Sequence, residues 1–528
     1  PNLDITVKTW STQAKDVILE APTIASLIAP GGGEPFSSEE PRFSIVNGSF
    51  ISDRPNVFQT EVTLTAAANG AEAVSKHSVT WQKTGTEESW QVSDWQVRML
   101  TVSRSPSPLF EEILDRAVRN PEELARARTS LHHKILVEGY FGGTVPKLPA
   151  GYSDSRFFPD SVNIHPSVSV ADVDGDGLDD VYVCVRWGKN LLFRNRGDGE
   201  FEECAARFGL DIDGRNTVAL FADFDNDGDL DLMQGRSLER SMLLVNHGGR
   251  FQPHPDPVSG DDELPWLVTS ASCADFNNDG LLDVFFCTYS PLDINTRISG
   301  SAESRSPEWA ERFLTAAESA EVGRRSADAH SYLGQVGPPN LLLVNRGDHF
   351  EKAAAAEVLA GYRNSFHAAW NDFDQDGDQD LYVANDFSFD HFFRNNGDSS
   401  FTDITTAAGI DTMGFAMGAA WGDYDGDGRD DLYVSNMYSK AGRRITSQVP
   451  DLDERFRAAA AGNFLFRNLG DGRLERMSGA DDKALPVYKA GWSWGGQFCD
   501  FDNDSHLDLY VLSGFYTPPA GYDIGVDL

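Results

Sequence analysis

The chain has 528 residues, of which 82 are Asp or Glu and 44 are Lys or Arg, so its formal net charge at pH 7 is −38. A surface this negative repels nucleic-acid phosphates and anionic lipid headgroups, which excludes a nucleic-acid partner unless cations neutralise the charge. The 33 Phe, 14 Tyr and 11 Trp exclude a disordered acidic chain, and the length predicts either several domains or one repeat-built domain with an extra module.

Residues 1–105 form an N-terminal α+β region. A helical pattern runs over residues 13–29, and alternating patterns predict strands at 58–67, 75–82 and 90–102. The run HSVTWQK followed by SWQVSDWQVRML resembles the terminal strands of NTF2-like α+β domains. The resemblance implies a pocket that is either catalytic or structural. We favour the structural role because the sequence shows no convergent His/Asp pair.

Residues 106–136 are predicted to form a helical connector. The run from 109 to 136, LFEEILDRAVRNPEELARARTSLHHKIL, has a helical pattern of apolar positions. Its adjacent His132 and His133 are assigned a solvated or packing role, which is commoner for such residues than metal ligation.

The remainder of the chain, residues 137–528, contains a segment that recurs six times. The copies are ADVDGDGLDDVYV from Ala171, ADFDNDGDLDLMQ from Ala222, ADFNNDGLLDVFF from Ala274, NDFDQDGDQDLYV from Asn371, GDYDGDGRDDLYV from Gly422 and CDFDNDSHLDLYV from Cys499. Their spacing gives a unit of about 51 residues, which is the mark of a repeat architecture. Two longer intervals carry insertions at 288–338 and 437–462.

A second element, a hairpin pattern, lies between successive aspartate motifs. It occurs as NLLFRNRGDGEF, SMLLVNHGGRF, NLLLVNRGDHF, HFFRNNGDSSF and NFLFRNLGDGRL, each with a turn between two strand-like runs. Four short strands per unit, with small residues in the first and bulky residues in the second, predict a β-propeller. We expect six blades, the last completed by strands from residues 137–165; seven blades remain an alternative.

Each aspartate motif has the spacing of a calcium loop. In D-x-D-x-D-G-x-x-D, the side chains at positions 1, 3, 5 and 9 and the backbone carbonyl of position 7 surround a hard cation, and Gly at position 6 permits the turn. This donor set fits Ca²⁺, about six ions in all, better than Mg²⁺, which retains its waters.

The predicted side-chain ligands are Asp172, Asp174, Asp176 and Asp180; Asp223, Asp225, Asp227 and Asp231; Asp275, Asn277, Asp279 and Asp283; Asp372, Asp374, Asp376 and Asp380; Asp423, Asp425, Asp427 and Asp431; and Asp500, Asp502, Asp504 and Asp508. The predicted backbone ligands are Leu178, Asp229, Leu281, Asp378, Arg429 and His506. The sixth loop departs from the pattern because Ser505 stands where Gly is expected. An EF-hand is excluded, because no loop has the Glu that an EF-hand needs at position 12.

These loops resemble the FG-GAP/VCBS repeats of integrin-α-type propellers. The runs NMYSKAGRRITSQ and GWSWGGQFCDFDNDSHLDLYVLSGF resemble the bacterial relatives of cartilage acidic protein, and the resemblance covers about residues 150–520. It implies an exported, calcium-binding propeller with an adhesive or scaffold role.

Two short motifs invite other interpretations. Arg196-Gly197-Asp198 and its copy at 346–348 spell an integrin-recognition tripeptide, but both occupy hairpin turns, which explains them better. Gly491-Trp492-Ser493-Trp494-Gly495 matches the G-x-S-x-G nucleophile pattern, yet it runs into an inner strand instead of the strand-to-helix turn that a serine hydrolase needs.

The blade order predicts an interaction face opposite the calcium loops. Both insertions connect second and third strands, and we expect helices at 307–322 and 452–461 within them. The partner-binding residues predicted for this face are Arg443, Arg444, Trp492, Trp494 and His367. The alternative is that the insertions only cover the channel mouth.

The function expected from the sequence is that of a non-catalytic, exported calcium-binding protein acting in adhesion, surface assembly or the binding of a protein or polysaccharide. Its compartment would be extracellular, cell-surface or periplasmic, where calcium is near millimolar. No stretch approaches the ~18 apolar residues of a membrane span. The alternative is a polysaccharide lyase or hydrolase on the decorated face, with His367 as the candidate acid/base.

Overall fold

The computed structural model describes residues 6–11, 42–51, 54–68, 71–84, 89–104, 112–129, 166–185, 188–260, 262–290, 308–328, 335–410, 413–438, 455, 459, 461–479 and 485–513. The chain divides into two compact units, Pro1–Glu112 with Asp502–Ser505 and Ile113–Phe501 with His506–Leu528. Among the described residues, no helix has the length and apolar character needed to cross a bilayer.

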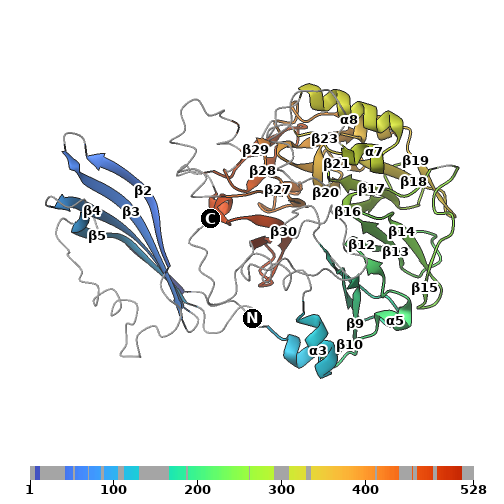
Figure 1. The fold of residues 1–528 in the computed structure, drawn as a ribbon, viewed down its shortest axis with the longest axis horizontal. Helices are drawn as coiled ribbons and strands as arrows, with labels where there is room; N and C mark the ends of the chain where they lie inside the picture. Colours follow the sequence, from blue (N-terminus) through green and yellow to red (C-terminus); the bar gives the residue numbers. More distant parts are fainter. Residues whose placement is uncertain are drawn as a thin grey trace. The chain divides into compact units, whose positions relative to one another are not determined.

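The first unit contains a five-stranded antiparallel sheet, blue in Figure 1, with strand order β1-β5-β4-β3-β2. Its strands are β1 (Thr6–Ser11), β2 (Arg42–Ile51), β3 (Arg54–Ala68), β4 (Ala71–Thr84) and β5 (Ser89–Arg104). The three predicted strands lie within β3, β4 and β5, whereas β1 and β2 were not predicted. The helix expected at 13–29 lies outside the described residues.

Two short helices occupy the described part of the connector: α2 (Leu114–Ala117) and α3 (Pro121–Ala127). The Asn120 side chain caps α3 by accepting the N–H of Glu122 at 3.0 Å, and Pro121 suits the first helical turn. The same Asn-Pro pair explains why two helices form where one was predicted, because proline disfavours a helical residue before it. His132 and His133 lie outside the described residues.

The second unit is built from repeated four-stranded antiparallel sheets in a propeller-like arrangement (Figure 1). The five four-stranded sheets are β6 (Val168–Ala171), β7 (Asp180–Val183), β9 (Leu191–Asn195) and β10 (Phe201–Glu203); β12 (Asn216–Ala222), β13 (Asp231–Arg236), β14 (Met242–Asn246) and β15 (Phe251–Pro253); β16 (Val268–Ala274), β17 (Asp283–Thr288), β18 (Leu341–Asn345) and β19 (Phe350–Lys352); β20 (Asn364–Asn371), β21 (Asp380–Asp386), β23 (His391–Asn395) and β24 (Phe401–Asp403); and β26 (Gly418–Gly422), β27 (Asp431–Ser435), β28 (Phe464–Asn468) and β29 (Leu474–Arg476). A sixth sheet has two described strands, β30 (Ser493–Cys499) and β31 (Asp508–Ser513).

Smaller elements connect these sheets. Two-residue strands form the pairs β8 (Gly188–Lys189) with β11 (Asp213–Gly214) and β22 (Ser388–Phe389) with β25 (Met413–Gly414). The short helices are α5 (Ala205–Phe208), α9 (Ala356–Leu359) and the 3₁₀ helix η2 (Pro486–Lys489).

Four of the hydrophobic clusters in the described part of the second unit lie between consecutive sheets. One cluster joins Tyr182 and Leu192 of the first repeat to Ala219 and Leu232 of the second. Equivalent clusters join repeats two and three, three and four, and four and five. The small inner and large second strands predicted from the sequence are confirmed, because alanines of the inner strands face buried bulky residues such as Tyr382, which is fully buried.

The first insertion packs against the outside of the repeats. It forms α7 (Glu308–Phe313) and α8 (Ala316–Asp328), so the helix expected at 307–322 is two helices broken near Thr315. Ala310, Phe313 and Val322 pack on Leu238 and Leu267 in a separate apolar cluster. The helix expected at 452–461 falls almost entirely outside the described residues.

Candidate metal-binding loops

The fourth loop shows how the backbone organises the aspartates. The two carboxylate oxygens of Asp372 accept the N–H groups of Asp376 at 2.9 Å and Gly377 at 3.0 Å, and Asp376 accepts the N–H of Asp378 at 3.0 Å. Gly377 has a φ of 97°, a left-handed conformation that favours glycine. The sequence therefore forms a tight turn that directs carboxylates inward without help from distant residues.

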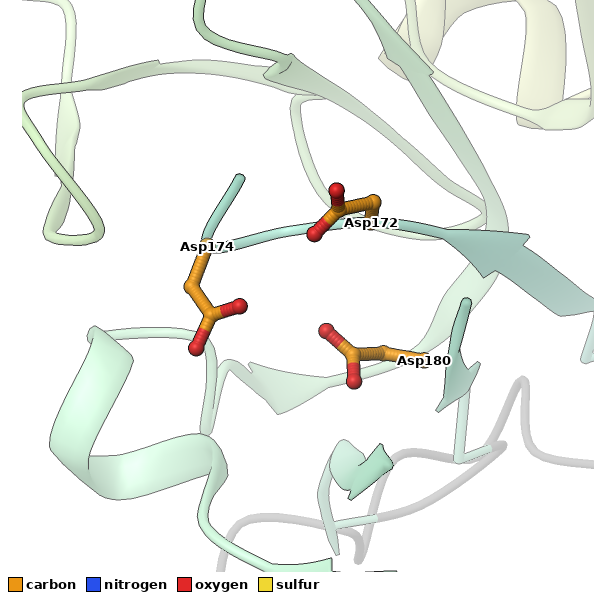
Figure 2. Close-up of side chains that lie close together, drawn as sticks. All are labelled: Asp172, Asp174 and Asp180. Atoms are coloured by element: carbon orange, nitrogen blue, oxygen red, sulfur yellow. The ribbon is translucent and has the colours of Figure 1, made fainter. Parts of the chain in front are cut away.

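Carboxylates of positions 1, 3 and 9 converge in four of the loops. One oxygen from each side chain lies within 4.8 Å of the others in the groups Asp172, Asp174, Asp180; Asp223, Asp225, Asp231; Asp372, Asp374, Asp380; and Asp423, Asp425, Asp431. Figure 2 shows the first of these groups, with the three carboxylates turned toward a common centre. The Oδ1 atoms of Asp174 and Asp374 are buried and have no hydrogen-bond partner, so the first and fourth groups each offer an unpaired oxygen donor. Several hard oxygen donors with an uncompensated buried oxygen fit a Ca²⁺-like cation.

The electrostatics of position 9 also favour a cation. Burial raises the pKa of the carboxyl to about 6 in Asp231 and Asp431, to about 7 in Asp283 and to about 8 in Asp380. Neighbouring loop aspartates add to each rise, while backbone N–H groups oppose it. A bound divalent ion would relieve this repulsion.

The third and sixth loops deviate from the other four. In the third, Asp275 and Asn277 accept the N–H of Asp279 at 2.9 and 3.0 Å, which reproduces the common turn with an amide at position 3. In the sixth, the converging carboxylates are Asp500, Asp502 and Asp504. Asp508 is exposed, so the expected position-9 ligand does not join that group.

A buried asparagine after each third strand was predicted only as a turn residue, yet it links neighbouring repeats. The Asn395 N–H donates to Asp380 at 2.8 Å, and its side-chain amide donates to the carbonyl of Phe276 at 2.8 Å. Phe276 lies at position 2 of the preceding loop, 119 residues earlier. The equivalent residues Asn246, Asn345 and Asn468 make the same bond to Val173, Phe224 and Phe373. Each loop is therefore tied to the one before it.

The loops are also joined directly through position 4. The amide of Asn226 donates to the carbonyl of Gly280 at 3.0 Å, and that of Gln375 donates to the carbonyl of Gly428 at 2.8 Å. Asn278 bridges the third and fourth loops by donating to Asp378 at 2.8 Å. Loops two to five thus form a hydrogen-bonded series.

Arginines contact some of the loops, which the sequence analysis missed. Arg194 on β9 places Nε 2.5 Å from Asp174 and Nη2 2.6 Å from Asp176. In the fifth loop, Arg467 lies 2.7 Å from Asp425 and 3.1 Å from Asp427. The sequence signal for these contacts was an arginine in the Phe-Arg-Asn run that recurs at the end of the third strand. Arg429, predicted only as a backbone ligand, also places its guanidinium on Asp427.

Two of the residues predicted to bind a partner, Trp492 and Trp494, contact each other. The rings of Trp492 and Trp494 stack 6.0 Å apart with 5° between their planes, and Trp494 meets Phe366 edge-on at 6.2 Å. His367 follows Phe366 on β20, and burial lowers its pKa to about 4, so it is neutral at pH 7. Its Nδ1 has no hydrogen-bond partner. Arg443 and Arg444 lie outside the described residues.

A buried carboxyl near these aromatics was not predicted. Tyr289, which packs with Phe366 and Met417, donates its hydroxyl to Asp386 at 2.7 Å. Burial raises the pKa of Asp386 to about 7. Asn385 and Asp386 end the second strand of the fourth repeat, and none of the other repeats has an aspartate at the equivalent place, but composition alone gave no reason to single Asp386 out.

The two motifs with alternative interpretations have structural explanations. Ser493 lies on strand β30, is fully buried and accepts a hydrogen bond from Asn463 at 3.1 Å, so it is not presented as an exposed nucleophile. Arg196-Gly197-Asp198 forms the turn between β9 and β10, where Asp198 accepts the N–H of Glu200 at 3.1 Å. Both predictions are confirmed.

The N-terminal sheet contains a polar cluster that the sequence analysis did not find. Trp95 donates its indole N–H to Nδ1 of His77 at 2.9 Å, and Nε2 of His77 lies 2.7 Å from the Ser75 hydroxyl. Because Nδ1 accepts, the proton of the neutral imidazole is on Nε2 and is donated to Ser75. Burial lowers the pKa of His77. A histidine that activates a serine as a general base accepts the hydroxyl proton, whereas His77 donates its own proton to Ser75.

Comparisons with known proteins place the loops in a repeat family. A family model described as an FG-GAP-like repeat matches residues 172–233 and 372–434, which hold loops one and two and loops four and five. The chain is 36% identical to human cartilage acidic protein 1 over 124 residues, covering 22% of this chain and 18% of that protein. The Xenopus tropicalis protein is 33% identical over the same length, covering 22% and 19%. The match thus spans less than a fifth of these relatives.

Solved structures give a more distant likeness. A crystal structure of BBS1N in complex with ARL6DN aligns with a TM-score of 0.35 and 10% identity, covering 66% of this chain and 76% of that one. The major Malassezia sympodialis allergen Mala s 1 aligns with a TM-score of 0.23 and 11% identity, covering 67% and 75%.

Proposed function

Because the chain carries FG-GAP-like repeats and is related over part of its length to cartilage acidic protein 1, we propose that it is a non-catalytic, calcium-binding β-propeller. The observation that carries this proposal is the convergence of three carboxylates in each of five loops. Their ligands would be those predicted from the sequence, although in the sixth loop only Asp500, Asp502 and Asp504 converge. A propeller with six blades accounts for the six repeats, with the last sheet completed by another part of the chain.

Calcium binding by these loops would favour a location outside the cytoplasm. The first five loops contain exposed positions, and carboxylate and carbonyl donors on surface loops give affinities suited to the high calcium concentration outside the cytoplasm. The N-terminal sheet would belong to a module of NTF2-like type. Its role would be structural, because the buried His77 is neutral and is held as a hydrogen-bond donor.

The test of calcium binding is a thermal melt of the full chain with excess calcium and with EDTA. Calcium bound only by the folded chain stabilises it according to its affinity and concentration, so we expect EDTA to lower the melting temperature by several degrees. A double substitution of the fourth loop, Asp372→Asn/Asp374→Asn, should remove one ion from the bound stoichiometry. An equal melting temperature with and without EDTA would refute calcium binding.

The role of the protein is proposed to be adhesion or the binding of a surface protein or polysaccharide. The stacked Trp492 and Trp494 support this, since aromatic faces bind apolar surfaces and sugar rings. Arg443 and Arg444 lie in the second insertion, residues 437–462, which the sequence predicts on the same face. Binding to a glycan and surface-protein array should fall in a Trp492→Ala/Trp494→Ala variant and in an Arg443→Ala/Arg444→Ala variant; unchanged binding in both would reject this face.

A second candidate function is polysaccharide cleavage, which the buried Asp386 favours. A carboxyl with a pKa of about 7 close to an aromatic surface is suited to act as a general acid. Reducing-sugar release from a polysaccharide panel, lost in an Asp386→Asn variant that keeps its melting temperature, would support an enzyme.

A further inference from the structure

The candidate metal-binding loops differ in how many arginine side chains contact their aspartates. In the fifth loop, Arg467 contacts Asp425 and Asp427, and Arg429 also contacts Asp427. Two guanidinium groups therefore occupy the carboxylates of positions 3 and 5. In the first loop a single guanidinium, that of Arg194, occupies the same two positions.

In the second loop, neither of the two positions that hold Arg467 and Arg429 in the fifth loop is an arginine. Val245 stands at the third-strand position of Arg467, and Asp229 stands at position 7 where the fifth loop has Arg429. Asp229 accepts the N–H of Gly248 at 3.1 Å and so is held beside its loop. Within the described part of the chain, the aspartates of this loop make no ion pair with an arginine or lysine. Its carboxylates are therefore uncompensated.

We propose that Arg194, Arg429 and Arg467 are internal cations that weaken divalent-ion binding by the first and fifth loops. The second loop would then fill first and the fifth last as calcium rises. This inference rests on the proposed function, because it assumes that the loops bind cations. The guanidinium groups of the three arginines determine affinity without being ligands, whereas the backbone carbonyl of Arg429 keeps its predicted ligand role.

The physical reason is competition for the same oxygens. A carboxylate that is shared with a guanidinium presents less negative charge to an incoming ion, and the two cations repel each other. One unit charge beside a partly exposed divalent site changes the affinity by roughly tenfold, about 1.4 kcal/mol. The side chain of Arg467 is 38% exposed and that of Arg194 24%, so solvent screening keeps the effect near this size.

The experiment is calorimetric titration of the full, metal-stripped chain with calcium. The Arg429→Met/Arg467→Met variant removes both charges while keeping an unbranched apolar stem, and we expect the weakest class of sites to tighten by tenfold or more. Arg473→Met is the matched control, because Arg473 lies in the hairpin of the same repeat and pairs with Asp471 at 2.5 Å, not with a loop ligand. It should leave every affinity unchanged.

The reciprocal variant tests the same idea in the second loop. Val245→Arg should weaken the tightest site by roughly tenfold, whereas Val245→Met, which alters the same position without charge, should not. Circular dichroism of each variant checks that the fold is retained.

The outcomes separate this inference from the proposed function. If no variant binds calcium, the proposed function fails. If calcium binds but the arginine variants bind it with unchanged or lower affinity, the arginines do not compete and only the present inference is overturned. A fall in affinity would assign them instead to holding the carboxylates in place.

Discussion

The buried Asn395 should stabilise two adjacent repeats at once. Its side-chain amide donates to the carbonyl of Phe276 at 2.8 Å and to that of Gln379 at 3.3 Å, and its carbonyl accepts the N–H of Gly397 at 3.1 Å. Asn395→Ala removes these bonds and leaves a buried carbonyl without a partner. The bond to the Phe276 carbonyl contributes about 1 kcal/mol and leaving that carbonyl without a partner costs about 1–3 kcal/mol, so these two effects alone give an expected loss of about 2–4 kcal/mol.

Urea denaturation measures this loss as a decrease in the free energy of unfolding of the second unit. The matched control is Asn396→Ala: Asn396 is the next residue and bonds Ser400 at 2.9 Å, but it is exposed, so its removal should cost under about 0.5 kcal/mol. Because the lost bond reaches the third loop, calcium affinity there should fall as well. Equal destabilisation by the two substitutions would refute the argument that Asn395 joins the repeats.

Three further predictions concern other parts of the second unit. Burial raises the pKa of Asp390 to about 7, above its unfolded value near 4, so this carboxyl stabilises the fold at low pH and the contribution is lost as pH rises through 7. In calcium, melting temperatures at pH 5.5 and 8.5 should differ less in Asp390→Asn than in the native chain; an unchanged difference would contradict the assignment. Gln375→Ala removes the bond to Gly428 and should make loops four and five release calcium independently, which stepwise EDTA titration would detect as a loss of cooperativity. Trp492→Phe should keep the core intact while weakening glycan or protein binding less than Trp492→Ala does, and equal losses would show that the indole is not a stacking surface.

The coupling between repeats follows from how the propeller-like unit is packed. Cores lie between sheets, asparagines cross from one repeat to the preceding loop, and position-4 amides link neighbouring loops. A cation bound in one loop therefore orders a segment that its neighbour also contacts. This arrangement gives a physical basis for expecting calcium to stabilise the repeats together and not one at a time.

Local features of the second unit were predictable from the sequence. The aspartate spacing places its donors within nine residues, so the turn that brings the first carboxylates together depends on nearby backbone, whereas the position-9 carboxylate is also held by the third-strand asparagine. The four-strand repeat also follows from a short pattern of small and bulky runs separated by hairpin turns. These predictions held because both ligand geometry and strand alternation are set over a few residues.

The remaining features were decided only by the tertiary structure. Arg194, Asn395 and Asp386 acquire their roles from partners in other segments of the chain, and the bond from Asn395 to Phe276 spans 119 residues. Asp508 holds the same loop position as the other position-9 aspartates, yet it is exposed and lies outside the converging group of its loop. The sequence by itself determined the repeat, the loop chemistry and the acidic charge. Which loops carry a compensating arginine contact, and how each repeat is joined to the next, required the fold, because these interactions form between segments that no local pattern relates.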